Sequence, residues 1–177
     1  MIQKKTISLV VNGKAVRSAA VPGISLASFL HENLGLTGTK VACAIGICKA
    51  CTVALKDEKT NSLSRVQACI TPVESVNGRA FLTVEGIEYE ARFSALQGAF
   101  LKHFSFQCGY CTPGFLLGAS LLMDQLRMNP IKVEQLDQLI LESVGDHICR
   151  CTGYSRYYSA IKDVIINTPG LILPAQS

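Results

Sequence analysis

The cysteines of this chain occur in groups, and grouped thiols are typical of metal centres or crosslinks. The eight cysteines divide into two sets of four, one in each half of the sequence. Thiolates are soft ligands that bind zinc ions and iron–sulfur clusters, and thiols can instead pair as disulfides. The first set is Cys43, Cys48, Cys51 and Cys69, and the second set is Cys108, Cys111, Cys149 and Cys151.

The spacing within the first set favours an iron–sulfur cluster. In CAIGICKAC (residues 43–51) the three cysteines follow the pattern C-x4-C-x2-C, and Cys69 comes later. This is the plant-type spacing for a [2Fe–2S] cluster held by four thiolates. Zinc usually takes two C-x2-C knuckles, whereas Cys69 stands alone on a predicted strand. Small residues in the loop (Ala42, Ala44 and Gly46) allow it to wrap a cluster closely.

The second set is less diagnostic by itself. A C-x2-C pair, Cys108 and Cys111, is followed by a C-x-C pair, Cys149 and Cys151, and such a set could bind zinc. A C-x-C pair is cramped, because both thiolates must come from nearly the same point of the chain. The division of the cysteines into four and four indicates two metal centres.

Disulfides are disfavoured by the expected compartment. The N-terminal apolar run, residues 7–11, is too short for a signal peptide, and the stretch 114–123 is far too short to span a membrane. We therefore expect a cytoplasmic protein without a membrane span, in which thiols stay reduced. A chain of 177 residues that is 49% hydrophobic can also build an ordinary core without staples.

The positive charge does not indicate nucleic-acid binding. The formal net charge is +4, but each oxidised [2Fe–2S] cluster with four thiolates would carry a formal charge of about −2. No patch of Lys and Arg interleaved with aromatic residues is present, so we expect no nucleic-acid partner. The histidines, His31, His103 and His147, stand apart from the cysteine groups, which favours structural or surface roles over ligation.

The first half of the chain predicts a small α+β unit. Alternating residues over 7–11, the turn Asn12-Gly13 and a return strand over 14–21 indicate a hairpin. A helix capped by Ser25 should follow and end at Gly35. Strands are expected over 51–55 and 65–70, on either side of a polar turn.

The second half predicts a four-helix bundle. Apolar residues at helical spacing indicate helices over about 93–107, 112–128, 133–145 and 157–168, with Thr112 as a cap and Pro113 at the first helical position. The second cysteine set lies in two loops between these helices, so both loops can converge on one site. The composition changes near residue 80, and we place the domains at 1–78 and 79–177.

Several motifs together resemble one family. They are CAIGICKACTV (43–53), ACITPV (68–73), TVEGI (83–87), QCGYCTPG (107–114) and CRCTGY (149–154). With them the chain resembles, over about residues 5–168, the small iron–sulfur subunit of the molybdenum hydroxylases, the xanthine dehydrogenase and aldehyde oxidoreductase family. The resemblance implies an N-terminal plant-type ferredoxin domain of β-grasp fold, followed by an all-α four-helix bundle, each with its own [2Fe–2S] cluster.

The resemblance also implies roles and partners. The second cysteine set would hold the cluster nearer molybdenum, and the first set would hold the outer cluster. Gln107 and Cys151 would lie against the pterin, although Gln107 could also be a solvated helix end. The partners would be a large subunit with molybdopterin and, usually, a medium subunit with FAD. Two residues depart from the family pattern, because Ala42 and Lys49 stand where glycine is usual. Lys49 would put a cation beside the outer cluster, unless its stem points into solvent.

The expected function is therefore electron transfer. The chain would relay electrons from the molybdopterin centre to FAD or another acceptor, while the partner hydroxylates a purine, another N-heterocycle or an aldehyde. The chain would belong to an oxidoreductase and have no turnover alone. Two alternatives remain: a stand-alone ferredoxin-type shuttle with two clusters, and a structural zinc protein. Co-purifying subunits would exclude the first alternative, and red-brown colour would exclude the second.

Overall fold

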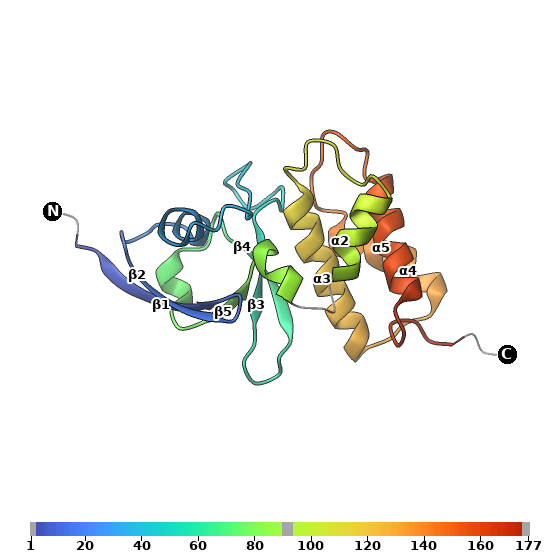
Figure 1. The fold of residues 1–177 in the computed structure, drawn as a ribbon, viewed down its shortest axis with the longest axis horizontal. Helices are drawn as coiled ribbons and strands as arrows, with labels where there is room; N and C mark the ends of the chain where they lie inside the picture. Colours follow the sequence, from blue (N-terminus) through green and yellow to red (C-terminus); the bar gives the residue numbers. More distant parts are fainter. Residues whose placement is uncertain (1–2, 90–93, 175–177) are drawn as a thin grey trace.

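A five-stranded mixed sheet and a group of helices lie side by side in the computed structural model, which describes residues 3–89 and 94–174 (Figure 1). The strand order in the sheet is β2-β1-β5-β3-β4. Only β1 and β5 pair in parallel, and the other neighbours are antiparallel. The expected α+β class is confirmed. The strands are β1 (Lys5–Val11), β2 (Lys14–Ala20), β3 (Thr52–Lys56), β4 (Leu63–Gln67) and β5 (Ala80–Leu82).

The predicted hairpin forms as expected. Val11 pairs with Lys14 across the turn, and Asn12 and Gly13 adopt φ angles of 53° and 77°. Ser25 caps the following helix by accepting a hydrogen bond from the Ser28 amide. That helix is α1 (Leu26–Ser28), and it continues as a π-helical turn over Phe29–Asn33. Its buried side chains pack on the apolar face of β1.

Two features of the sheet differ from expectation. Strand β5 lies near the expected domain boundary, where no strand was predicted, and it pairs with both β1 and β3. Three residues are too few to produce a periodic pattern, so sequence reasoning missed it. The expected strand over 65–70 also ends early, at Gln67, because its partner β3 begins only at Thr52. Cys69 therefore lies in a turn after β4, and the strand position predicted for it was wrong.

Four longer helices share the second core. Phe100, Phe115 and Tyr157 are fully buried in it, beside many aliphatic side chains. The expected helical residue Phe93 lies outside the described residues. Cys111, rather than Thr112, is the N-cap of the second of these helices, so Pro113 takes the second helical position. The helices are α2 (Ser94–Lys102), α3 (Thr112–Met128), α4 (Leu136–Val144) and α5 (Ser155–Asn167).

Short 3-10 turns complete the secondary structure, at Val73–Val76, Val84–Tyr89 and Val133–Gln135. The second turn belongs to TVEGI, where Glu85 accepts hydrogen bonds from the Gly38 amide and the Thr83 hydroxyl. Thr83 also exchanges hydrogen bonds with Asn12 in the hairpin turn. These bonds fix the chain just before it enters the helices. Among the helices that the structure describes, none is long and apolar enough to cross a bilayer.

The two halves meet where α3 begins. This helix packs against β3 and β4, and its first turn touches the loop that bears the first cysteine set. A Cβ atom built on Gly114 would lie 2.5 Å from the Lys49 carbonyl oxygen and 3.2 Å from the Ala50 Cα. Only glycine permits so close an approach of two backbones. The loops of both cysteine sets lie along one edge of the molecule, at the top of Figure 1.

This contact predicts that Gly114→Ala destabilises the protein. The added methyl group meets backbone atoms that cannot rotate away, and such overpacking costs about 1–3 kcal/mol. Gly98, inside α2, is the matched control, because a Cβ there meets nothing within 4 Å. Gly98→Ala should be neutral or stabilise by up to about 1 kcal/mol. Thermal unfolding of both variants measures the difference, and equal melting temperatures would contradict the proposed close contact.

Candidate metal centres

The first cysteine set is built on a loop with an unusual backbone. The segment 41–51 has no regular secondary structure, and Ala44, Gly46 and Lys49 adopt φ angles of 54°, 75° and 59°. The left-handed conformation turns the chain sharply and is costly for residues other than glycine. Ala44, which was expected only to give the loop a small side chain, and Lys49 both adopt it despite that cost. Ala42, the other departure expected from the family pattern, does not adopt a positive φ.

Within the first set the thiols contact one another in two pairs. The Cys48 amide donates a hydrogen bond to the Cys43 Sγ at 3.4 Å, and this bond, together with hydrogen bonds from the Ile45 and Ile47 amides and the Cys48 thiol, lowers the pKa of Cys43 to about 6. Cys51 lies in contact with Cys69, and burial raises the pKa of Cys51 to about 12, helped by the nearby thiols. The pairs are thus Cys43 with Cys48, and Cys51 with Cys69.

The second set forms two pairs in the same way. Its cysteines come from the α2–α3 loop and the α4–α5 loop, which converge as predicted. The Cys108 and Cys151 Sγ atoms are 3.6 Å apart, and both residues are exposed. Cys111 and Cys149 contact each other farther inside. Burial raises the pKa of Cys111 to about 11, whereas hydrogen bonds from Thr152 and Cys111 outweigh burial and lower that of Cys149.

Pairs of thiols fit the chemistry of a [2Fe–2S] cluster. Each iron in such a cluster takes two protein thiolates. Two thiolates on one tetrahedral metal lie about 3.8 Å apart, given metal–sulfur bonds of about 2.3 Å. The separation of 3.6 Å between the Cys108 and Cys151 sulfurs agrees with that value. In the described residues, no three His, Cys, Asp or Glu side chains gather as the ligands of one ion.

A backbone hydrogen bond joins the two sets directly. The Ile148 amide donates to the Cys48 carbonyl at 3.1 Å. Ile148 immediately precedes Cys149, so this bond and a short piece of backbone connect a cysteine of each set. Gly114, which touches Lys49, lies at the same junction.

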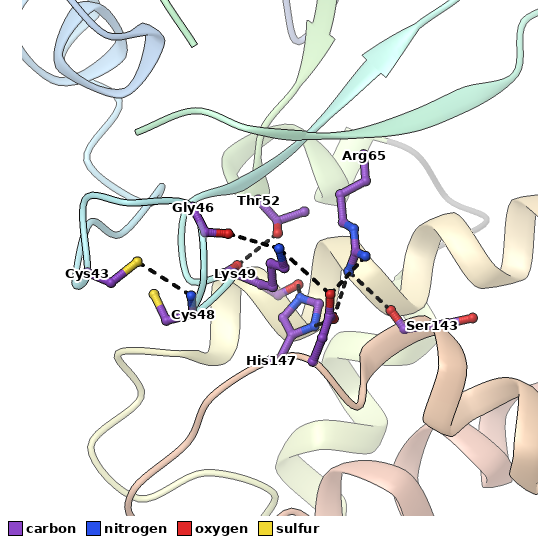
Figure 2. A network of polar contacts seen from close by, with 10 residues as sticks. Cys43, Gly46, Cys48, Lys49, Thr52, Arg65, Ser143 and His147 are labelled. Carbon is purple, nitrogen blue, oxygen red and sulfur yellow. Dashed lines mark hydrogen bonds and ion pairs between the residues drawn. The ribbon is translucent and has the colours of Figure 1, made fainter. Parts of the chain in front are cut away.

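Lys49 lies in a charged network at this junction (Figure 2). Its ammonium donates to the Gly46 carbonyl at 2.8 Å and lies 3.8 Å from Asp146. Arg65 binds both carboxylate oxygens of Asp146 at 2.9 Å. Only 19% of the Lys49 side chain is exposed, so the stem does not point its charge into solvent. Removal of Lys49 would leave Arg65 and Asp146 as a neutral pair.

His147 supports the same junction through contacts with Gly114 and Asp146. Its side chain is buried, and Nε2 lies 2.9 Å from the Gly114 carbonyl oxygen, which can only accept a hydrogen bond. The ring proton therefore sits on Nε2, and Nδ1 lies 3.3 Å from Asp146 without a hydrogen bond. Burial lowers the pKa of His147 to about 4, although Asp146 opposes the shift. The imidazole is neutral at physiological pH.

The other expected site residues are placed as follows. Gln107 is exposed and directly precedes the exposed Cys108. His31 contacts the Thr39 carbonyl, and His103 contacts Asp163, so both have structural partners of their own.

Sequence reasoning missed two hydroxyl groups beside the second set. Tyr157 lies 3.5 Å from the Cys111 Sγ, and Thr152 lies 3.1 Å from the Cys149 Sγ. Tyr157 was expected only as the first apolar residue of the last helix. Thr152 lies within the motif CRCTGY (149–154), directly after Cys151, and this position could have indicated a hydrogen bond to a cysteine.

Two family profiles match most of the chain. A 2Fe-2S iron-sulfur cluster binding domain matches residues 9–74, and a [2Fe-2S] binding domain matches residues 83–162. A probable xanthine dehydrogenase subunit of Bacillus subtilis (strain 168) is 37% identical over 153 residues, which are 86% of this chain and 81% of that protein. Aldehyde oxidase 2 of Rattus norvegicus is 40% identical over 151 residues, but the match spans 11% of its length.

A solved structure resembles nearly the whole chain. The crystal structure of quinoline 2-oxidoreductase from Pseudomonas putida 86 contains a chain that is 34% identical, with a TM-score of 0.77. The match covers 96% of this chain and 94% of that one.

The two sets of thiols predict the metal content of the purified protein. Four irons and four acid-labile sulfides per chain are expected, because each set of four thiolates suits one cluster. Cys48→Ser should disturb the paramagnetic signal of one cluster and leave the other. Iron and sulfide analysis with electron paramagnetic resonance (EPR) checks both statements. Stoichiometric zinc, or loss of both signals in the variant, would contradict two independent centres.

The charged network predicts that Lys49 raises the reduction potential of the first cluster. A reduced cluster is more negative, so a cation held nearby stabilises it. Lys49→Gln removes the charge and should lower that potential in a redox titration of the assembled complex. Lys49→Arg keeps the charge and should leave the potential near the parent's, while both variants keep a side chain at the same left-handed position. Equal potentials in all three proteins would make Lys49 a purely structural residue.

Proposed function

Because the chain belongs to the xanthine dehydrogenase and aldehyde oxidoreductase family, as the small iron–sulfur subunit of a molybdenum-dependent oxidoreductase, we propose that it is the electron-transfer subunit of such an enzyme. Two bound [2Fe–2S] clusters would supply one-electron transfer between a molybdopterin centre in a large partner subunit and FAD, or another acceptor, in a medium subunit.

The cysteines of this chain would supply all the ligands. We assign Cys43, Cys48, Cys51 and Cys69 to the first cluster, and Cys108, Cys111, Cys149 and Cys151 to the second. The pairing of the thiols supports this assignment, because each pair can serve one iron. The low pKa of Cys43 favours the thiolate form that a ligand must adopt.

The observation that carries the proposal is the hydrogen bond from the Ile148 amide to the Cys48 carbonyl. A relay needs its two centres close together and rigidly placed. This bond ties a residue next to Cys149 to a cysteine of the first set, and the Gly114 contact and the Asp146 network hold the same junction. The backbone of this chain therefore sets the separation of the two centres.

Exposure suggests which side of the second set faces the large subunit. Cys108 and Cys151 are exposed, whereas Cys149 is buried and Cys111 is partly buried. Gln107 is exposed beside the open pair, so Gln107 and Cys151 are available to contact the pterin of the partner. The first set would then lie nearer the flavin subunit, as the outer cluster.

The substrate would be chosen by the large subunit. The names of the similar proteins refer to xanthine, to aldehydes and to quinoline. Xanthine is a purine, and quinoline is another N-heterocycle. We propose that the complex oxidatively hydroxylates a compound of one of these classes, and that it works in the cytoplasm.

We retain the proposed domain division at 78/79. Residues 1–78 would form a β-grasp domain of the plant ferredoxin type, and residues 79–177 would form a four-helix bundle. Strand β5 lies just after this boundary, although it pairs with strands of the first domain.

The proposal predicts that the isolated chain cannot oxidise substrate. Dithionite should bleach its visible absorption, because any strong reductant can deliver electrons to the clusters. Candidate purines, N-heterocycles or aldehydes should bleach it only when the large subunit is present. The sample for comparison is the purified native complex, in which molybdenum, pterin and flavin analysis shows that the partner subunits are present. Substrate-driven bleaching of the chain alone, or a native protein without larger subunits, would contradict the proposal and favour a stand-alone shuttle.

A further inference from the structure

Tyr157 brings a hydroxyl group to a cysteine of the second set. Its oxygen lies 3.5 Å from the Cys111 Sγ and 2.8 Å from the Thr112 hydroxyl. Tyr157 is on α5, whereas Cys111 and Thr112 lie at the beginning of α3, so the contact joins two helices. A buried tyrosine usually finds a hydrogen-bond partner for its hydroxyl group, and here a sulfur and an oxygen are both in reach.

The aromatic core holds this hydroxyl group in place. The Tyr157 ring is fully buried and stacks on Phe115, with ring centroids 4.1 Å apart and planes at 4°. Phe100 packs against the same ring edge-on, with centroids 5.2 Å apart. The ring therefore cannot swing away, and only the hydroxyl proton is free to rotate.

Ligand chemistry sets the direction of the hydrogen bond. A metal-bound cysteine is a thiolate, so its sulfur has no proton and can only accept. A tyrosine hydroxyl is protonated at neutral pH and can donate. The Thr112 hydroxyl can donate to the Tyr157 oxygen while the Tyr157 proton points at sulfur, which satisfies both hydroxyl groups.

We propose that Tyr157 is a positioning residue for electron transfer, which donates a hydrogen bond to the Cys111 thiolate and thereby raises the reduction potential of the second cluster. Reduction adds negative charge that spreads onto the sulfurs, and a hydrogen bond to sulfur is stronger in the reduced state. This inference rests on the proposed assignment of Cys111 as a cluster ligand.

The placement of hydroxyl donors in the second set is uneven. Thr152 accepts a hydrogen bond from the Tyr154 amide, which leaves its own proton available for the Cys149 Sγ at 3.1 Å. Tyr157 and Thr152 thus both serve the inner pair of thiols, Cys111 and Cys149. Within the described residues, the hydrogen bonds to the outer pair, Cys108 and Cys151, include no hydroxyl donor.

Tyr157→Phe in the assembled complex tests the proposal, because phenylalanine keeps the stacked ring and removes only the hydroxyl group. An EPR-monitored redox titration should show the second cluster harder to reduce. We expect at least a threefold fall in its ratio of reduced to oxidised form at a fixed potential, which corresponds to about 28 mV at 59 mV per tenfold change. The first cluster serves as an internal reference and should not shift.

Tyr158→Phe is the matched control, since it makes the same change at the next residue, whose ring packs on Tyr154. In Tyr158→Phe the reduction potential of the second cluster should equal that of the parent protein. Thr112→Val is a second variant: it removes the partner of the Tyr157 oxygen and leaves the Tyr157 proton on the Cys111 sulfur, so the potential should stay near the parent's value.

Three outcomes would overturn the inference: an unchanged potential in Tyr157→Phe, loss of the second cluster in that variant, or an equal fall in Thr112→Val. Iron and sulfide analysis of the parent protein distinguishes these outcomes from a failure of the proposed function, in which the chain would not carry two clusters. If the parent lacks two clusters, the assignment of Cys111 itself is wrong. If it contains both and the potential does not move, only the role of Tyr157 fails.

Discussion

The close contact between the first turn of α3 and the loop of the first cysteine set is the constraint on which the arrangement of the molecule depends. Gly114 lets α3 approach the Lys49 carbonyl, and the Ile148 amide bonds to the neighbouring Cys48 carbonyl. Both contacts are made by backbone atoms, which have less freedom to move than side chains. The position of each cysteine set thus determines the position of the other.

Charge and strain are concentrated at the same junction. Lys49 adopts a left-handed backbone conformation and holds its ammonium between the Gly46 carbonyl and Asp146, while Arg65 and neutral His147 contact the same carboxylate from other sides. Local strain of this kind is kept where the surrounding structure compensates for it. The junction combines a fixed geometry with a local positive charge, and both properties suit a pair of centres that exchange electrons.

The sequence predicted what local patterns encode and missed what depends on tertiary contact. Cysteine spacing separated the two sets, and periodicity located the hairpin and the long helices, because these signals lie within short windows. Strand β5 is too short to produce such a signal. Cys69 was placed on a strand because the register with β3, which ends the ladder at Gln67, is not visible in the sequence. Tyr157 fits an apolar helix face, so the sequence does not indicate that its hydroxyl group reaches Cys111.

The central claim is that one rigid junction in this chain holds two [2Fe–2S] clusters close together. Low-temperature EPR of the fully reduced complex tests it most directly, because two nearby unpaired electron spins split each other's signals. The account predicts splitting in both cluster signals when both are reduced, and its disappearance when only one cluster is reduced. Two signals that simply add, with no splitting at full reduction, would contradict it.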